Sequence, residues 1–220
     1  MNRIPRHVLR ALEALAQSPI NNSALAMAET TDLSHDTLYR ALEYPLPFYF
    51  ALALQRCKDL GGLQKGFLLI DDVLIKRYRS GQMGLKRLKD TSNGSYVFGF
   101  SLVVLAWTDG KRKLPLAFLP YFADEGTKLE LALALLRWAK EEGFQPEGVL
   151  FDAWYGAKEV LEWLQTAGWP FVTRLRCNRL LDGVRLKRRA GSRWVKTGRL
   201  PGVRVQARPE GDRPRGFPLR

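Results

Sequence analysis

The sequence has few of the residues that build metal clusters or disulfide frameworks. It contains 2 cysteines and 2 histidines in 220 residues. Cys57 and Cys177 stand in no ligand spacing, so neither a zinc site nor a disulfide framework is expected. No uncharged apolar stretch reaches about 18 residues, and no apolar leader follows the first residues. These absences predict a cytoplasmic protein without a membrane span.

Acidic charge is also scarce, and it is unevenly distributed. The chain has 35 Lys and Arg against 22 Asp and Glu, a formal charge of +13. The segment 174–220 holds 15 basic and 3 acidic residues, which is +12 of that total. Such a cationic segment predicts a polyanionic partner, nucleic acid before an acidic membrane surface. A hydrophobic content of 46% is enough for a packed core.

Two short apolar runs end in aspartate. Residues 67–70 precede Asp71 and Asp72, and residues 148–151 precede Asp152. A run of this kind predicts a buried strand, and a carboxylate at its end is costly unless it is paired or binds a cation. If the two strands are neighbours, Asp71 and Asp152 meet and favour a divalent metal ion. The alternative is that each aspartate only caps a helix or forms a turn.

Residues 1–65 are predicted to be helical, with helices over 5–17, 23–31 and 35–42. Ser34 can cap the third of these helices. Two short helices joined by a tight turn are typical of a helix-turn-helix, and a small helical bundle that packs on the main domain is the alternative. The candidate DNA-contacting residues are Ser34, His35, Thr37, Tyr39 and Arg40.

From residue 66 the pattern predicts alternating strands and helices. Strands are expected over 67–75, 96–107 and 114–122, then helix 127–143, strand 149–151, helix 157–167 and strand 170–175. The order β-β-β-α-β-α-β predicts an α/β fold with a ribonuclease H-like mixed sheet, in which the first and fourth strands are adjacent. The predicted domains are 1–65, 66–182 and a basic, poorly ordered 183–220.

The stretch 76–94 is predicted to be a basic loop or hairpin extension. Its cations either contact phosphates or form a solvated charged loop. The candidates are Lys76, Arg77, Lys86, Arg87 and Lys89. On the helix that begins near residue 127, Lys128 and Glu130 are expected to be surface residues.

The motif Leu-Leu-Ile-Asp71-Asp72, followed by Val-Leu-Phe-Asp152-Ala-Trp-Tyr155, resembles the DDE transposases of bacterial insertion sequences. The nearest type is the insertion-sequence-4 superfamily, over about residues 20–182. The resemblance implies DNA strand cleavage and transfer with two Mg²⁺ (or Mn²⁺) ions held by Asp71 and Asp152. Asp71 matches the first aspartate of the family, and Asp72 is the alternative for that position. It implies the double-stranded DNA of element ends as partner, together with a second copy or a full-length transposase. Trp154 and Tyr155 would stack on an extruded base or pack beneath the site.

The family's third acid is a glutamate in a Tyr-x-x-Arg-x-x-x-Glu motif, which this sequence lacks. Glu210 is the only glutamate after Glu162, and Pro209 and Gly211 flank it. The resemblance therefore implies a truncated and inactive copy. One alternative is a DNA-binding remnant that regulates or inhibits a full-length copy. Another is a small magnesium-dependent nuclease that uses Asp72 or Asp109.

Overall fold

The computed structural model describes residues 4–17, 28, 32–77, 85–90, 94–122 and 126–174, together with four short strands between 180 and 207. The chain divides into two compact units, Met1–Leu52 and Ala53–Arg220. The three predicted domains, with boundaries at 65 and 182, stay a prediction. Among the described residues, no helix has the length and apolar character needed to cross a membrane.

The first unit is helical. Helices α1 (Arg6–Gln17) and α3 (His35–Leu42) pack through small and aliphatic side chains, and α4 (Leu46–Asp59) begins in this unit. Ser34 caps α3, because its Oγ accepts a hydrogen bond from the Thr37 N–H at 3.3 Å. The predicted helix over 23–31 lies outside the described residues, apart from Ala28. The buried cluster consists of Val8, Ala11, Ala14, Leu33, Leu38 and Ala41.

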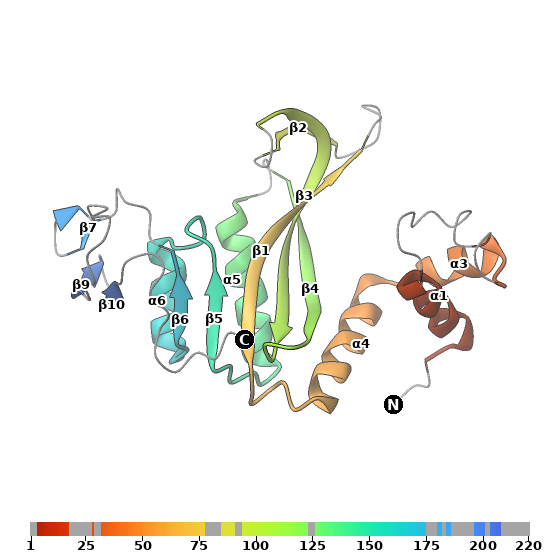
Figure 1. Cartoon of the computed structure of the whole chain (residues 1–220), viewed down its shortest axis with the longest axis horizontal. Coiled ribbons are helices and arrows are strands. Elements are labelled where there is room, and N and C mark those ends of the chain that lie inside the picture. Colours follow the sequence, from red (N-terminus) through yellow and green to blue (C-terminus); the bar gives the residue numbers. More distant parts are fainter. Residues whose placement is uncertain are drawn as a thin grey trace. The chain divides into compact units, whose positions relative to one another are not determined.

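The second unit is built on a six-stranded mixed sheet, shown in Figure 1. Antiparallel pairs join β1 to β3 and β3 to both β2 and β4, whereas β1–β5 and β5–β6 are parallel. The order β4-β3-β1-β5-β6 is that of the ribonuclease H-like sheet, so this prediction is confirmed. The strands are β1 (Phe67–Lys76), β2 (Lys86–Lys89), β3 (Tyr96–Thr108), β4 (Lys113–Tyr121), β5 (Gly148–Phe151) and β6 (Phe171–Thr173).

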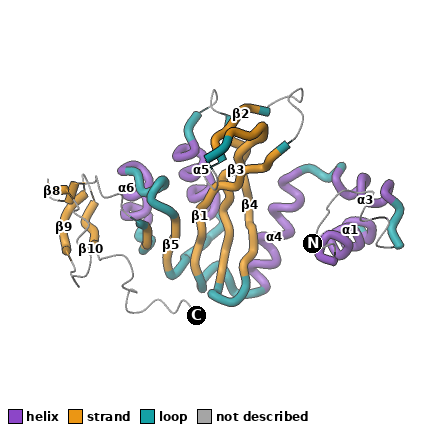
Figure 2. Tube along the Cα trace, turned by 45° about the horizontal axis from the view of Figure 1, so that its top comes forward, coloured by secondary structure: helices purple, strands orange, loops and turns teal. Residues whose placement is uncertain are grey.

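Two helices, α5 (Lys128–Glu141) and α6 (Lys158–Ala167), lie on the same side of this sheet in Figures 1 and 2. Alternate residues of β3 from Ser101 to Trp107 are buried, whereas Leu102 and Val104 are only partly buried. Because successive strand residues point to opposite faces, the sheet has one helix-covered face and one more open face. We call the second the open face.

The stretch 76–94 contains β2, which pairs with the outer end of β3 over Lys86↔Gly99 to Lys89↔Tyr96. Together β2 and the outer ends of β1 and β3 form an arm that rises beyond β5 and β4 in Figure 1. Of the two alternatives predicted for 76–94, a basic loop or a hairpin extension, the described residues form the hairpin extension. Antiparallel strands need only local pairing, so the arm can extend past the part of the sheet that packs on helices.

Two small antiparallel pairs follow the core. They are β7 (Leu180–Leu181) with β8 (Val184–Arg185), and β9 (Lys196–Leu200) with β10 (Val203–Ala207). The sequence analysis predicted a poorly ordered segment over 183–220, whereas β9 and β10 are regular strands within it. Val203, Val205 and Ala207 alternate with Arg204 and Gln206, which is a strand pattern that the richness in arginine obscured. The remainder of 183–220 lies outside the described residues.

Candidate functional site

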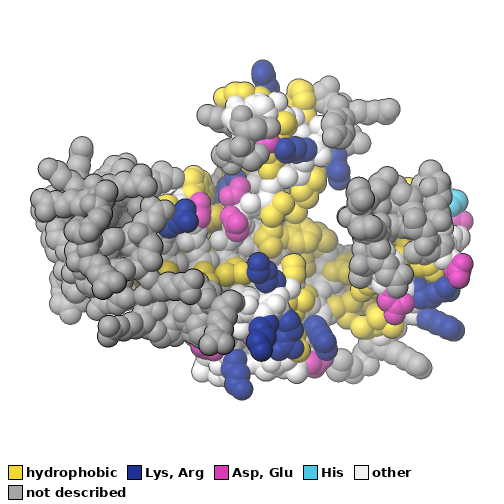
Figure 3. Space-filling model, viewed as in Figure 1, with side chains coloured by type: hydrophobic (Ala, Val, Ile, Leu, Met, Phe, Trp, Pro, Cys, Tyr) yellow, Lys and Arg dark blue, Asp and Glu magenta, His cyan; other side chains and the backbone are white. Residues whose placement is uncertain are grey.

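The two predicted acids come together where β1 and β5 run side by side. The parallel register ends at Ile70↔Phe151, so Asp71 and Asp152 are the next residues on neighbouring strands. Residues in register on parallel strands face the same side, here the open face of the sheet. Acidic side chains gather on this face over the end of β5 and the middle of β1 in Figure 3. Asp71 and Asp152 are called the acid pair below.

Short backbone contacts hold the acid pair in place. One oxygen of Asp152, Oδ1, accepts hydrogen bonds from the Trp154 and Tyr155 N–H groups at 2.8 and 3.3 Å. Asp71 Oδ1 accepts one from the Asp72 N–H at 2.8 Å. Partial burial raises the pKa of Asp71, and the nearby charges of Asp72 and Asp152 raise it further. The pair therefore repels itself, and a cation bound between the carboxylates relieves this repulsion.

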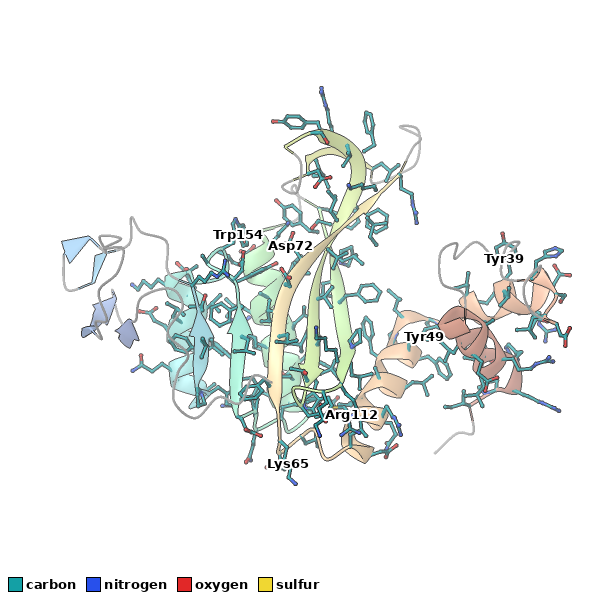
Figure 4. All side chains as sticks on the ribbon, in the orientation of Figure 1. Tyr39, Tyr49, Lys65, Asp72, Arg112 and Trp154 are labelled. Carbon is teal, nitrogen blue, oxygen red and sulfur yellow. The ribbon has the colours of Figure 1, made fainter. Side chains whose placement is uncertain are left out.

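Asp72 is committed to a different set of contacts on the helix-covered face. Its Oδ2 accepts hydrogen bonds from Lys128 Nζ at 2.5 Å and from Ser101 Oγ at 3.3 Å. The Tyr155 hydroxyl donates to its Oδ1 at 3.4 Å. Figure 4 shows Asp72 beside Trp154 near the end of β5. These contacts satisfy Asp72 without a metal ion and leave Asp71 as the acid beside Asp152.

Lys128 is not the surface residue that the sequence analysis expected. Its side chain is only 19% exposed, and its Nζ lies 5.4 Å from the Tyr121 ring centroid and 5.9 Å from that of Trp154. Lys128 is the first residue of α5, and the packing of α5 on the sheet brings its side chain into contact with Asp72 of β1. The expectation holds for Glu130, which is exposed and completes a capping box with Thr127.

The structure separates the roles of the two aromatic residues after Asp152. Tyr155 is fully buried, so it packs beneath the site. Burial and the charges of the three aspartates raise its pKa, which keeps the hydroxyl protonated as a donor to Asp72. Trp154 is 40% exposed beside the acid pair, with its ring centroid 5.1 Å from that of Tyr155. Trp154 is therefore the ring that a bound molecule can reach.

The predicted phosphate contacts of the arm fall on its two faces. Lys76 faces the helix-covered side and pairs with the buried Asp90 at 2.5 Å. Arg77 and Arg87 lie on the open face, where Arg87 Cζ is 5.0 Å from the Tyr96 ring centroid. The backbones of Lys86 and Lys89 lie in β2, and their side chains are outside the described residues.

The predicted DNA contacts of the first unit run from the N-cap of α3, Ser34, to its last turn, which contains Arg40. Ser34 and Thr37 are used in the cap, with 3.0 Å between their hydroxyl oxygens. His35 Nε2 lies 3.1 Å from Asp36 Oδ1. Tyr39 is 56% exposed and Arg40 is exposed as well, so these two are free to reach a ligand.

The oxygen chemistry of the acid pair fits Mg²⁺ or Mn²⁺. Mg²⁺ keeps several of its waters and is usually bound through one or two carboxylates, which is what Asp71 and Asp152 offer. Within the described ranges, no cluster of three His, Cys, Asp or Glu side chains could hold a metal ion. A metal ion at this place would be held by these two carboxylates together with water.

Comparisons with known proteins give one matching family and several similar solved structures. A family of proteins described as the transposase DDE domain matches residues 62–213. The solved piggyBac transposase synaptic complex with hairpin DNA is similar at 10% identity and a TM-score of 0.43, covering 79% of this chain and 41% of that one. The Mos1 transposase paired-end complex with left transposon end is similar at 14% identity and a TM-score of 0.28, covering 78% and 60%.

A Drosophila P element transposase strand transfer complex is similar at 12% identity and a TM-score of 0.30, covering 83% of this chain and 51% of that one. The chain thus spans 41% to 60% of the length of these three solved transposases. None of the curated proteins matches it.

Proposed function

We propose that this chain, which belongs to the transposase DDE domain family, cleaves and transfers DNA strands at the ends of a mobile element. The observation that carries the proposal is the β1–β5 register, which makes Asp71 and Asp152 neighbours. Two neighbouring carboxylates, one from the middle of β1 and one directly after β5, are ligands suited to metal-assisted phosphodiester chemistry. The insertion-sequence-4 type is the member of the family that the motifs favour.

In this proposal Asp71 and Asp152 hold the divalent metal ion. When bound, Mg²⁺ or Mn²⁺ lowers the pKa of an attacking water or hydroxyl and stabilises the leaving oxygen. The chain itself orients the acids, because the Trp154 and Tyr155 N–H groups hold the Asp152 carboxylate. The Lys128–Asp72 ion pair keeps the second aspartate of β1 away from the metal.

The proposed partner is the double-stranded DNA of element ends. The exposed Tyr39 and Arg40 of α3 supply contacts from the first unit, and Arg77 and Arg87 supply phosphate contacts from the arm. A second copy of the chain or a full-length transposase completes the assembly. The similar solved complexes contain transposon-end or hairpin DNA, which supports the choice of DNA as ligand.

The test is metal-dependent nicking of supercoiled plasmid by the purified chain. We expect Mg²⁺ or Mn²⁺ to permit nicking, and Asp71→Ala and Asp152→Ala each to abolish it. Asp109→Ala is the matched control, because Asp109 pairs with Arg112 at 2.6 Å in the β3–β4 turn. Nicking that survives both acid-pair substitutions would contradict the proposal.

A second candidate function is DNA binding without cleavage, as a regulator of a full-length copy. It is favoured by the contacts of Asp72, which is held by Lys128 and so does not act as a third metal ligand. In this case the purified chain binds element-end DNA but does not nick it with any divalent metal ion. Asp152→Asn would then leave the DNA affinity unchanged within twofold, roughly the effect of a neutral surface change.

A further inference from the structure

The open face of the arm carries an unusual set of side chains. Phe98 lies opposite Arg87 in the β2–β3 register. Its carbonyl oxygen accepts the Arg77 N–H at 2.8 Å, which places Arg77 opposite it on the other side. Residues directly opposite one another in antiparallel strands face the same side, and so do alternate residues of one strand. Tyr96, Phe98 and Phe100 therefore form one column between the two arginines. We call these five residues the aromatic face.

This column is open to solvent at its outer end. Tyr96 is 59% exposed and Phe98 is 41% exposed. Arg87 Cζ lies 5.0 Å from the Tyr96 ring centroid, and Arg77 Cζ lies 6.0 Å from that of Phe100. Large exposed aromatic side chains that adjoin one another mark a binding surface. Hydrophobic and basic side chains gather over the arm in Figure 3.

The charges of the aromatic face select the kind of ligand. The buried carboxylate of the arm, Asp90, faces the other side and pairs with Lys76. On the open face, the described arm residues beyond Asp71 carry cations and apolar groups only. An aromatic column between two guanidinium groups matches a polyanion that also presents flat apolar rings. Nucleic-acid strands with unpaired bases have that chemistry, because each base offers a π-face and each phosphate a negative charge.

We infer that the aromatic face binds unpaired bases of a DNA strand, which stack on Tyr96 and Phe98 while Arg77 and Arg87 contact its phosphates. Alternate residues of a strand lie about 7 Å apart, so successive rings can each receive a base of an extended strand. Sheets that present two or three aromatic rings bind single-stranded nucleic acid in this way. A duplex keeps its base faces stacked on one another and cannot use the rings.

The position of the face indicates which stretch of DNA is bound. Along β1 the same face continues from Arg77 through Ile75 and Val73 to Asp71. Val73 is 48% exposed, so this path is not closed by packing. A strand that stacks on the arm therefore leads toward the acid pair. The inference deepens the proposed function and rests on it for the choice of DNA, although binding can be measured without cleavage.

The experiment measures binding of the full chain by fluorescence anisotropy, with a single-stranded oligothymidine and with a duplex of equal length, in the presence of a chelator. Phe98→Leu keeps an apolar side chain and removes the ring, and Tyr96→Ser removes the other exposed ring. Val97→Ala is the control on the opposite face of the same strand. Arg87→Gln removes one of the two guanidinium groups. Its charge control is Lys113→Gln, at the exposed start of β4.

We expect Phe98→Leu and Tyr96→Ser each to weaken single-strand binding by about fivefold or more, with duplex binding unchanged within twofold. An oligothymidine in which 5-iodouracil replaces thymine should crosslink to residues 96–98 on irradiation, as mapped by mass spectrometry. Thermal unfolding checks that each variant is folded, and both rings are exposed enough to be replaced without loss of core packing.

Three results would overturn the inference. Equal weakening for single strand and duplex would mean that the arm contacts phosphates only. Unchanged single-strand binding together with no crosslink would mean that the rings bind no bases. A change from dimer to monomer on Phe98→Leu, seen by light scattering, without a change in single-strand affinity, would make the face a contact between two copies. If neither ring substitution changes single-strand binding although the parent chain nicks plasmid, the inference is refuted and the proposed function stays intact.

Discussion

The ion pair between Lys128 and Asp72 makes a prediction about metal binding as well as stability. Replacing Lys128 with methionine keeps most of the side-chain volume and removes the charge. The two side chains are 19% and 32% exposed, and their charged atoms lie 2.5 Å apart. Exposed pairs contribute about 0–1 kcal/mol, and removing one partner of a buried pair costs about 3–5 kcal/mol. The partial exposure of this pair puts the expected loss at about 2 kcal/mol.

In the second unit a loss of about 2 kcal/mol lowers the melting temperature by roughly 4–8 °C. The measurement is thermal unfolding by circular dichroism in a chelator. Lys158→Met is the matched control, because Lys158 is also the first residue of its helix and pairs with Glu162 at 3.7 Å. That pair is about half exposed, so the control should stay within roughly 0.5 kcal/mol of the parent. Any helix-dipole effect is common to both variants.

Metal ions should partly reverse the loss in Lys128→Met. Asp72 and Lys128 act on the Asp71 carboxylate with opposite charges, across the strand. Without the ammonium group, the negative charge of Asp72 is uncompensated, and the acid pair attracts divalent ions more strongly. Mn²⁺ should therefore raise the melting temperature of the variant by more than it raises that of the parent. Adding Asp72→Asn to the variant should recover part of the lost stability without metal. The reasoning is refuted if Lys128→Met and Lys158→Met melt alike, or if Mn²⁺ stabilises the variant no more than the parent.

Three further predictions concern stability. The raised pKa of Asp71 means that the folded state binds its proton more tightly, so stability falls as pH rises above its usual pKa near 3.8. Asp71→Asn should flatten that dependence and make the metal-free chain more stable at neutral pH, as pH-dependent urea titrations would show. Gly66→Ala should cost at least about 2 kcal/mol, since φ is +82° and the new Cβ would lie 2.4 Å from the Thr108 carbonyl oxygen. Its control Gly61→Ala, at φ +73° in open space, should cost about 1 kcal/mol in the same urea assay. Thr127→Ala removes the capping box of α5 and should cost about 1 kcal/mol, and an unchanged urea midpoint would refute this.

Local sequence features were sufficient to predict the elements of the core and their order. The helix that begins after Thr127 is defined by its cap and its apolar spacing, both of which act within a few residues. The apolar runs before Asp71 and Asp152 predicted strands, and the order of elements then required the two to be neighbours. The sequence pattern thus predicted Asp152 and narrowed its neighbour on the other strand to Asp71 or Asp72. It did not identify β10, because its alternation of apolar and polar residues is only five residues long and lies in an arginine-rich segment.

By itself, then, the sequence determined the order of the elements, the caps of α3 and α5 and the two apolar runs that precede the acids. Short-range sterics, hydrogen bonding and hydrophobic periodicity decide these features. Only the tertiary structure decided which aspartate of β1 faces Asp152. It also decided that Lys128 reaches Asp72, and that three aromatic rings of β3 line up between arginines of two other strands. These outcomes depend on strand register and on the packing of α5 against the sheet. Register and packing are set by contacts between residues far apart in the chain, and no local pattern encodes such contacts.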